Sequence, residues 1–256
     1  MNNFNNNFIS WFLGFCDAEC SFICNPVARV NKQGTITSYR VFYRIQIGLN
    51  IIDRPILEFI QKNLNNLGKI YDYPHKNEST LCFVALEDIK YLIVNVFSNY
   101  PLLTSYQQNR LAKLKKGILN NISGVKTIED FNAIFDNLGI QKVNIESLSK
   151  SYLEHWLIGF LNGEVSFTTF KNRGIIKPKV SLEHTDKNAL ILFKNNLDLG
   201  PSVLELKKRE NRKITYRIDL TSAKDLNKIC IFINTADSLI GNKLNQYQNW
   251  KDNFNL

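Results

Sequence analysis

Two glutamates occupy matching places in a repeated segment and are the first candidates for chemistry. Residues 11–22, WFLGFCDAECSF, recur about 145 residues later as residues 156–167, WLIGFLNGEVSF. Glu19 and Glu164 hold the same position in the two copies, each at the end of a mostly apolar helical pattern. An acid at the end of an apolar helix has few structural reasons to exist, and here the arrangement occurs twice. The alternative is a pair of helix-terminal acids in ordinary solvent.

Small residues on the two repeated helices predict that these helices pack closely against each other. Each copy has a glycine and, four residues later, a second small residue, and the four positions are Gly14, Ala18, Gly159 and Gly163. Small residues one turn apart let two backbones approach, an effect best known from membrane helices. Packing through these faces would bring the two acids side by side, where they repel unless a cation neutralises them.

Carboxylates without a histidine nearby in sequence suit a hard, oxygen-preferring metal ion such as Mg²⁺. A metal ion between paired carboxylates can activate water and stabilise a leaving oxygen when a phosphodiester is cleaved. The spacing of the repeat therefore predicts a divalent-metal site at the two acids.

The charge of the chain favours a negatively charged partner. The 256 residues carry a formal net charge of +9, which no single run of lysines explains. A globular protein with this excess is expected to meet a polyanion, although basic enzymes with small substrates also exist.

The cysteines and the apolar runs indicate the compartment. The five cysteines are odd in number and scattered, which suits a reducing compartment better than a disulfide scaffold. No run approaches the ~20 apolar residues of a membrane span, so we expect no membrane partner. Heavy use of asparagine, isoleucine and lysine would follow from an A/T-rich genome such as that of an organelle.

Each half of the chain predicts the same order of elements, α-β-β-α-β-β-α-α. In the first half the opening helix is followed by a half-buried strand over 37–50, a helix that Asp53 can cap, a strand pair around 74–77, and helices over 87–97 and 102–118. In the second half the corresponding elements are a strand over 176–184, a helix that starts at Asp186, a strand pair around the basic turn 207–213, and two closing helices. The connecting segment includes a helix that Thr127 could cap. Two similar halves imply a pseudo-twofold axis in a single chain.

Basic and polar side chains share one face of the predicted strands. Alternation places side chains of this kind on the solvent face of both halves, and they are Arg40, Arg44, Gln46, Lys177, Lys179, Lys213, Thr215 and Arg217. A two-stranded ribbon fits the major groove of DNA, where Arg, Lys and Gln can hydrogen-bond base edges. The alternative for any one of them is a solvated charged surface.

The two repeated segments resemble the signature helices of single-chain LAGLIDADG homing endonucleases and the related intron maturases. The resemblance extends to GLNIIDRPILEFIQKNLNNLG, YPLLTSYQQNRL and SLIGNKLNQYQNW, and so covers nearly the whole chain. It implies an α+β fold of two pseudo-twofold-related αββαββα subdomains, whose antiparallel sheets form a DNA-binding saddle. The subdomains would cover residues 8–118 and 151–256, with a connecting segment over 119–150.

The same resemblance implies the activity. Glu19 and Glu164 would bind divalent metal, Mg²⁺, and each would cut one strand of double-stranded DNA, leaving short 3′ overhangs. Lys243 matches a basic residue that sits beside the active site in many members. The protein would be a monomer encoded in an intron of an organelle gene, such as a mitochondrial one.

The chain departs from the family pattern beside both acids. Cys20 and Val165 stand where the family usually has glycine, and Tyr106 stands at the first-half position that matches Lys243. If the glycine position needs a positive φ, valine would be strained, and if it needs only clearance, the larger side chains would crowd the metal. These departures favour an alternative function, an intron RNA maturase or a nucleic-acid-binding protein that has lost cleavage.

Overall fold

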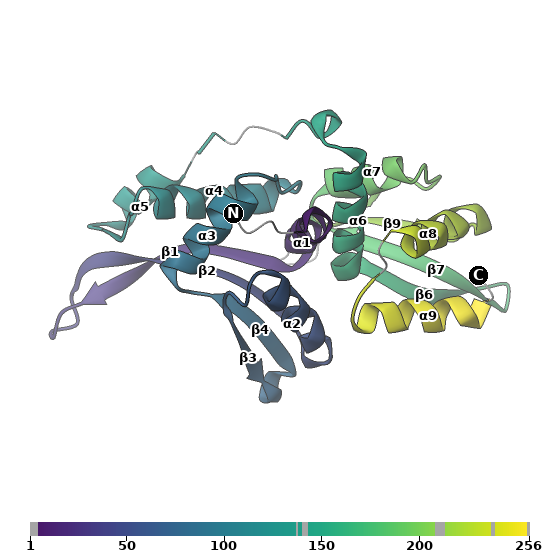
Figure 1. Ribbon diagram of the computed structural model, residues 1–256, viewed down its shortest axis with the longest axis horizontal. Coiled ribbons are helices and arrows are strands. Elements are labelled where there is room, and N and C mark those ends of the chain that lie inside the picture. Colours follow the sequence, from purple (N-terminus) through teal and green to yellow (C-terminus); the bar gives the residue numbers. More distant parts are fainter. Residues whose placement is uncertain (1–4, 137, 140–142, 208–212, 237–238, 255–256) are drawn as a thin grey trace. The chain divides into compact units, whose positions relative to one another are not determined.

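The computed structural model describes residues 5–136, 138–139, 143–207, 213–236 and 239–254 (Figure 1). Contacts divide the chain into two compact units. We call Glu19–Asn144 the first-repeat unit, and Met1–Ala18 together with Ile145–Leu256 the second-repeat unit. The predicted boundaries 8–118, 119–150 and 151–256 follow the sequence repeat, whereas these units follow contacts, and the repeat-based boundaries stay a prediction.

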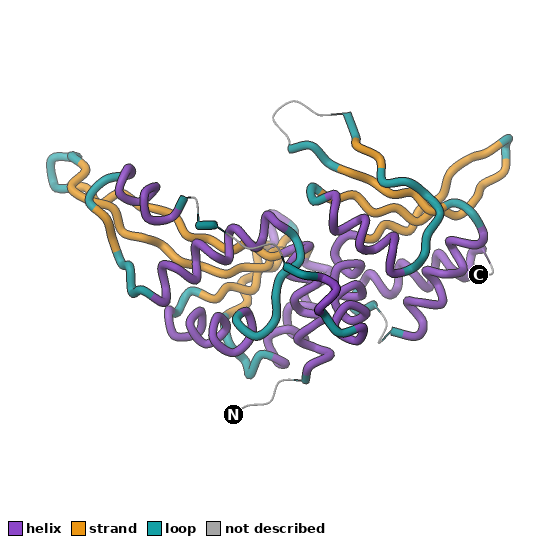
Figure 2. Tube along the Cα trace, turned by 90° about the horizontal axis from the view of Figure 1, so that it is seen from above, coloured by secondary structure: helices purple, strands orange, loops and turns teal. Residues whose placement is uncertain are grey.

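The first-repeat unit is one antiparallel sheet with helices packed against it. Its strands are β1 (Cys20–Val30), β2 (Ile36–Asn50), β3 (Lys69–Tyr73), β4 (Glu78–Phe83) and the short β5 (Gly124–Val125). They pair in the order β1-β2-β4-β3, with β5 added on β2. Figure 2 shows the strands in orange with helices in purple beside them. The helices are α2 (Arg54–Asn63), α3 (Leu86–Leu92), α4 (Ser105–Leu119) and α5 (Ile128–Phe135), with a π-helical turn over Ile93–Phe97 and short 3-10 turns over Ile51–Asp53 and Pro74–Lys76.

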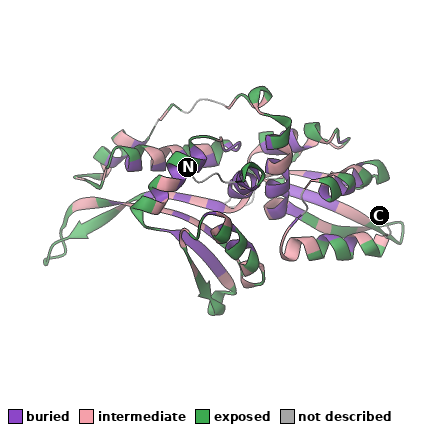
Figure 3. Cartoon of the chain, in the orientation of Figure 1, coloured by how far each residue is buried: buried purple, intermediate pink, exposed green. Residues whose placement is uncertain are grey.

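Alternation along β2 separates a core face from a polar face, as the sequence predicts. Val41, Tyr43, Ile45 and Ile47 are buried, whereas the residues between them are only half-buried (Figure 3). Period-two burial follows from the pleat of a strand with one face on the core. The helices α2, α3 and α4 contact this sheet and complete the core.

Two of the three predicted helix caps form side-chain hydrogen bonds. Thr127 caps α5 in a reciprocal capping box with Asp130, and the Asp186 carboxylate accepts hydrogen bonds from the first turn of α7. Asp53 occupies the N-cap position of α2 but makes no side-chain cap hydrogen bond, and α2 ends at Asn63. The chain leaves α2 through Asn65 and Asn66, both at positive φ, a conformation that asparagine tolerates better than most residues.

The second-repeat unit is built around a four-stranded antiparallel sheet with helices packed against it. Its elements are α1 (Asn6–Glu19, up to Ala18), α6 (Lys150–Glu164), β6 (Val165–Asn172), β7 (Ile175–His184), α7 (Lys187–Asn196), β8 (Leu204–Glu205), β9 (Tyr216–Leu220), α8 (Ala223–Thr235) and α9 (Asn242–Phe254), with a 3-10 turn over Ile145–Ser147. The strands pair in the order β6-β7-β9-β8. Val165 pairs with Leu182, as Cys20 pairs with Ile47 in the first-repeat unit. The predicted mixture of helices and antiparallel sheets is confirmed.

The helices α1 and α6 touch backbone to backbone through one glycine on each. A Cβ added at Gly14 would lie 2.7 Å from the Trp156 carbonyl carbon, and one added at Gly159 would lie 2.7 Å from the Trp11 carbonyl carbon. Each tryptophan also stacks on the phenylalanine one turn further on, Trp11 on Phe15 and Trp156 on Phe160. The contact is therefore reciprocal, and only glycine leaves room for it. Ala18 and Gly163 are half-buried near the ends of the same helices.

Replacement of Gly14 by alanine should disrupt this helix pair. The added carbon meets backbone, which cannot rotate away as a side chain can, so the helices must separate. We expect Gly14→Ala to lower the free energy of unfolding by about 3 kcal/mol or more, at the upper end of overpacking effects, measured by urea unfolding. Gly48→Ala is the matched control, because its Cβ would meet side chains rather than backbone, with the Glu78 Oε1 at 3.1 Å and the Thr80 Oγ1 at 3.5 Å. Equal stability of the two variants would contradict the packing argument.

Candidate catalytic acids and nucleic-acid interface

Each acid is the last residue of its helix and is followed at once by a strand. Glu19 ends α1 and Glu164 ends α6, and both are half-buried. A negative charge at a helix C-terminus opposes the helix dipole at a cost of roughly 0.3–1 kcal/mol. Helix stability therefore does not explain the two acids, which agrees with a chemical role.

The residues that replace the family glycines fit the backbone without strain. Val165 has φ −71° and ψ 139°, ordinary extended geometry, and Cys20 is not among the described residues with positive φ. Both side chains are buried on the core face of their strands, with only 2% of Cys20 and 1% of Val165 exposed. The conformational and steric reasons to doubt these positions therefore do not apply to this backbone.

A polar side chain from a later helix holds the carbonyl of the residue after each acid. In the second-repeat unit the Lys243 ammonium donates to the Val165 carbonyl at 2.8 Å. In the first-repeat unit the Gln107 amide donates to the Cys20 carbonyl at 2.6 Å. Sequence matching pairs Lys243 with Tyr106, one residue earlier, and so misses Gln107. Gln107 is a buried glutamine in the first turn of α4. Local sequence pattern does not reveal its contact, because the two residues lie 87 positions apart in the chain.

His184 lies beside Glu164 and was also missed. Its Nε2 is 3.8 Å from the Glu164 Oε1, and its Nδ1 accepts a hydrogen bond from the Asp186 backbone at 2.9 Å. Burial lowers the pKa of His184 and outweighs the opposing effects of the Asp186 backbone and charge and of the Asp17 backbone. The imidazole is therefore neutral at neutral pH. By strand register the matching residue of the first-repeat unit is Leu49.

The polar face of the first-repeat sheet holds the three predicted nucleic-acid contacts on β2. Arg44 lies over the Phe42 ring at 4.9 Å from its centroid and donates to the Gln46 Oε1 at 3.2 Å. Arg40 is exposed and lies 5.9 Å from the centroid of the same ring. Phe42 thus restrains two guanidinium groups on one face, which limits the side-chain entropy that they would lose on binding.

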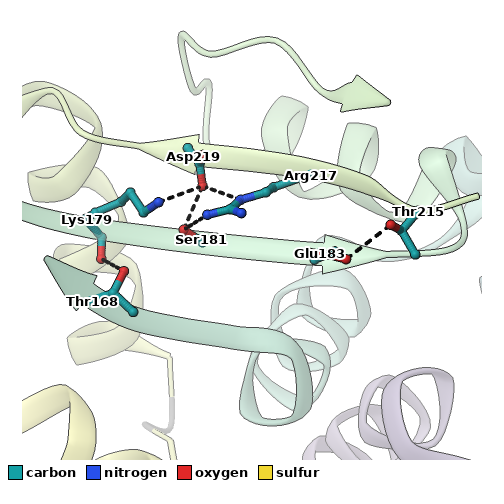
Figure 4. A network of polar contacts seen from close by, with 7 residues as sticks. All are labelled: Thr168, Lys179, Ser181, Glu183, Thr215, Arg217 and Asp219. Atoms are coloured by element: carbon teal, nitrogen blue, oxygen red, sulfur yellow. Dashed lines mark hydrogen bonds and ion pairs between the residues drawn. The ribbon is translucent and has the colours of Figure 1, made fainter. Parts of the chain in front are cut away.

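The polar face of the second-repeat sheet carries a connected network (Figure 4). The Asp219 carboxylate accepts hydrogen bonds from Ser181 at 2.6 Å and from the Arg217 Nε at 2.8 Å, and lies 3.7 Å from the Lys179 Nζ. Arg217 also reaches Ser181 at 3.4 Å. The predicted residues Lys179 and Arg217 are therefore linked through an acid that the sequence analysis did not select, although it alternates with Thr215 and Arg217 along the strand.

Asp219 stays ionised within this network. Burial tends to raise the pKa of its carboxyl, but hydrogen bonds from Ser181 and Arg217 and the charges of Arg217 and Lys179 lower that pKa below its usual range. A carboxylate among basic groups can accept from the N4 amino group of cytosine, whereas Arg and Lys donate to guanine. The face thus offers both donors and an acceptor to base edges.

The remaining predicted contacts lie on or near the same sheet. Thr215 donates to the Glu183 Oε1 at 3.1 Å, and Lys177 and Lys213 are exposed. Most of the basic turn after Lys207, residues 208–212, lies outside the described residues. Thr215 is therefore engaged within the protein in this state.

Residues 12–117 match the family model described as LAGLIDADG endonuclease. Over this range the chain matches the LAGLIDADG family. The match covers the first repeat. In the second repeat a helix again ends on an acid and is followed by a strand, and this strand pairs with the next one in the same register.

Of three curated relatives, two are named as probable intron-encoded endonucleases. The chain is 28% identical over 198 residues to the uncharacterized mitochondrial protein RF1 of Saccharomyces cerevisiae, covering 74% of this chain and 38% of the relative. It is 25% identical to the probable intron-encoded endonuclease Cox1-I1b of Schizosaccharomyces pombe, covering 63% of this chain and 41% of that protein. It is 32% identical over 93 residues to the probable intron-encoded endonuclease 3 of Neurospora crassa, covering 36% of this chain and 16% of that protein. The chain thus spans less than half the length of these relatives.

Solved structures of LAGLIDADG enzymes share the fold. The I-LtrWI homing endonuclease bound to target DNA has a TM-score of 0.72 at 23% identity, covering 98% of this chain and 91% of that chain. I-GzeII in complex with its DNA target has a TM-score of 0.72 at 24% identity, covering 98% and 89%. Among the described residues of this chain, the helices are too short or too polar for a bilayer crossing.

Asp219 should limit how strongly the protein binds DNA of any sequence. Asp219→Asn changes the summed charge of Lys179, Arg217 and residue 219 from +1 to +2. We expect tighter binding to a non-target duplex, and a plot of log affinity against log salt that is steeper by about 0.9. Fluorescence anisotropy over a salt series measures both. Asp252→Asn on α9 removes the same formal charge elsewhere, and an equal change in both variants would show an effect of net charge alone.

Proposed function

We propose that the chain is a site-specific, homing-type endonuclease that hydrolyses both strands of a double-stranded DNA target and leaves short 3′ overhangs. The observation that carries the proposal is the pair of matched acids, each set between an apolar helix and the first strand of a sheet with a basic, polar face. The family-model match over residues 12–117 and the DNA-bound structures of proteins with this fold support it.

The donor chemistry at the acids fits Mg²⁺. Glu19 and Glu164 would each supply a carboxylate to bound metal. Within the described parts of the chain no cluster of three or more His, Cys, Asp or Glu could hold a metal ion. Mg²⁺ accepts such a site, because it commonly binds through one or two carboxylates and takes the rest of its ligands from water and phosphate oxygens. When bound, the metal would supply Lewis-acid stabilisation of the phosphate and an activated water.

The other residues of the proposal hold and read the substrate. The exposed and half-buried basic groups of β2, β7 and β9 would contact phosphates and base edges in the major groove. Lys243 would place a permanent positive charge next to Glu164 through the backbone at Val165. Phe42 and Asp219 would fix the directions of the neighbouring guanidinium and ammonium groups before DNA arrives.

Cell location and assembly follow from the same proposal. The protein would act in mitochondria or another organelle, as the names of the relatives suggest. It would act as a monomer, because one chain carries both acids and both sheets.

One observation favours a second function. The carbonyl beside Glu19 is held by the neutral amide of Gln107 rather than by a cation. A first site weakened in this way would suit an intron RNA maturase, or another nucleic-acid-binding protein, that keeps the fold and has lost cleavage.

Loss of either carboxylate should abolish double-strand cleavage but not binding. We expect wild type with Mg²⁺ to cut a duplex spanning the intron-less host gene. Glu19→Gln and Glu164→Gln should each slow double-strand cutting by about 100-fold or more, with affinity for the duplex within about threefold of wild type.

Glu154→Gln is the control, because it removes a carboxylate from the same helix as Glu164, where it faces Lys150. It should cut at the wild-type rate. Undiminished double-strand cutting by Glu19→Gln would refute the assignment of the acids. Binding of intron RNA without any cutting of DNA by wild type would favour the maturase.

A further inference from the structure

The two acids have chemically different neighbours although they hold matching places in the repeat. The carbonyl after Glu164 is held by an ammonium group, that of Lys243, at 2.8 Å. The carbonyl after Glu19 is held by a neutral amide, that of Gln107, at 2.6 Å. Each contact lies within one unit, so the difference belongs to the local structure of each repeat.

A second difference between the two acids also places a polar side chain beside Glu164 and none beside Glu19 at the matching position. His184 places a ring nitrogen 3.8 Å from the Glu164 carboxylate. Its Nδ1 is fixed by the Asp186 backbone and its ring packs edge-on against Phe160. At the matching register position the first-repeat unit has Leu49, which has no polar atom to offer. An ammonium group and an imidazole thus accompany Glu164, while an amide and an alkyl group occupy the matching places beside Glu19.

We propose that the two half-sites are unequal and that the strand served by Glu164 is cut first, with nicked DNA accumulating as an intermediate. The inference rests on the proposed endonuclease function and deepens it. In each half-reaction a water oxygen bonds to phosphorus as the bond from phosphorus to the 3′ oxygen breaks. One proton of the water moves to solvent or a base, and the departing 3′ oxygen takes up a proton to become a hydroxyl.

The charge of the reacting phosphate explains the direction of the asymmetry. Negative charge builds on the phosphoryl and leaving oxygens in the transition state, and a fixed positive charge nearby stabilises it. Hydrogen bonds from a charged donor are roughly twice as strong as neutral ones. Lys243 supplies such a charge at the Glu164 site, whereas the Gln107 amide at the Glu19 site supplies only a dipole. His184 acts as a positioning residue, because it packs against the Glu164 carboxylate from β7.

The test measures each strand separately. A target duplex carries a different fluorescent label on each strand, and single-turnover rates are followed with Mg²⁺. Glu19→Gln and Glu164→Gln identify which strand each acid serves, because each variant should leave one strand uncut. In wild type we expect the Glu164 strand to be cut about tenfold or more faster than the Glu19 strand.

Exchange of the two carbonyl partners should shift this ratio. Lys243→Gln should slow the Glu164 strand toward the rate of the Glu19 strand, and Gln107→Lys should speed the Glu19 strand. Because Gln107 is buried and a lysine there could disturb folding, the Lys243→Gln variant and the wild-type ratio each test the proposal alone. Duplex affinity and the unfolding midpoint are measured on every variant, so that a rate change at constant affinity and stability is assigned to the site.

Three outcomes would overturn the proposal. Equal rates for the two strands in wild type, a faster Glu19 strand, or an unchanged ratio in Lys243→Gln would each refute the asymmetry while leaving the endonuclease function intact. Cutting of neither strand by wild type that binds the duplex would refute the proposed function itself, and the asymmetry with it.

Discussion

The close approach of α1 and α6 at Gly14 and Gly159 is the constraint on which the functional site depends. An added Cβ at either glycine would run into the backbone of the other helix, so neither position accepts a side chain. Each helix then ends on an acid and passes directly into the first strand of a sheet. The same contact therefore buries the two apolar helices that end on Glu19 and Glu164. Packing energy supports a feature that helix stability alone would disfavour.

The two sheets solve the problem of holding basic side chains in different ways. On β2 the guanidinium groups of Arg40 and Arg44 lie over Phe42, so that an aromatic ring restrains them without reducing their charge. On β7 and β9 Lys179 and Arg217 share the carboxylate of Asp219, which restrains them and offsets part of their charge. The aromatic ring on β2 leaves the attraction of the two arginines to phosphate unreduced. The carboxylate between β7 and β9 weakens that attraction but fixes the geometry of the basic side chains. A protein with both kinds of surface would bind its two half-sites with unequal salt dependence.

The repeat allowed much of the fold to be predicted from sequence, because helices, strands and caps follow from local pattern. The alternation along β2 and the caps at Thr127 and Asp186 depend on residues within a few positions of one another. Gln107, His184 and Asp219 could not be found in this way. Their partners are a backbone carbonyl on β1, a carboxylate on α6 and side chains on neighbouring strands, all of which sheet register and helix docking bring together. Aligning the two repeats by residue type selects Tyr106, whereas the residue that contacts the Cys20 carbonyl is Gln107, one position later. The alignment fails here because the contact depends on where α4 begins.

The buried polar groups at matching positions of the repeat have different partners in the two halves. Asp17 and Asn162 occupy the same position in the two helices, and both are buried. Asp17 accepts from the Trp156 indole at 2.9 Å, whereas Asn162 accepts from the Ile240 backbone at 2.7 Å. An unpaired polar group in either place would cost about 1–3 kcal/mol, so each residue is tied to its own partner. Exchange of the two would place a carboxylate where an amide now meets a loop. The asymmetry beside the acids is therefore part of a wider divergence, in which matching positions keep their burial and change their partners.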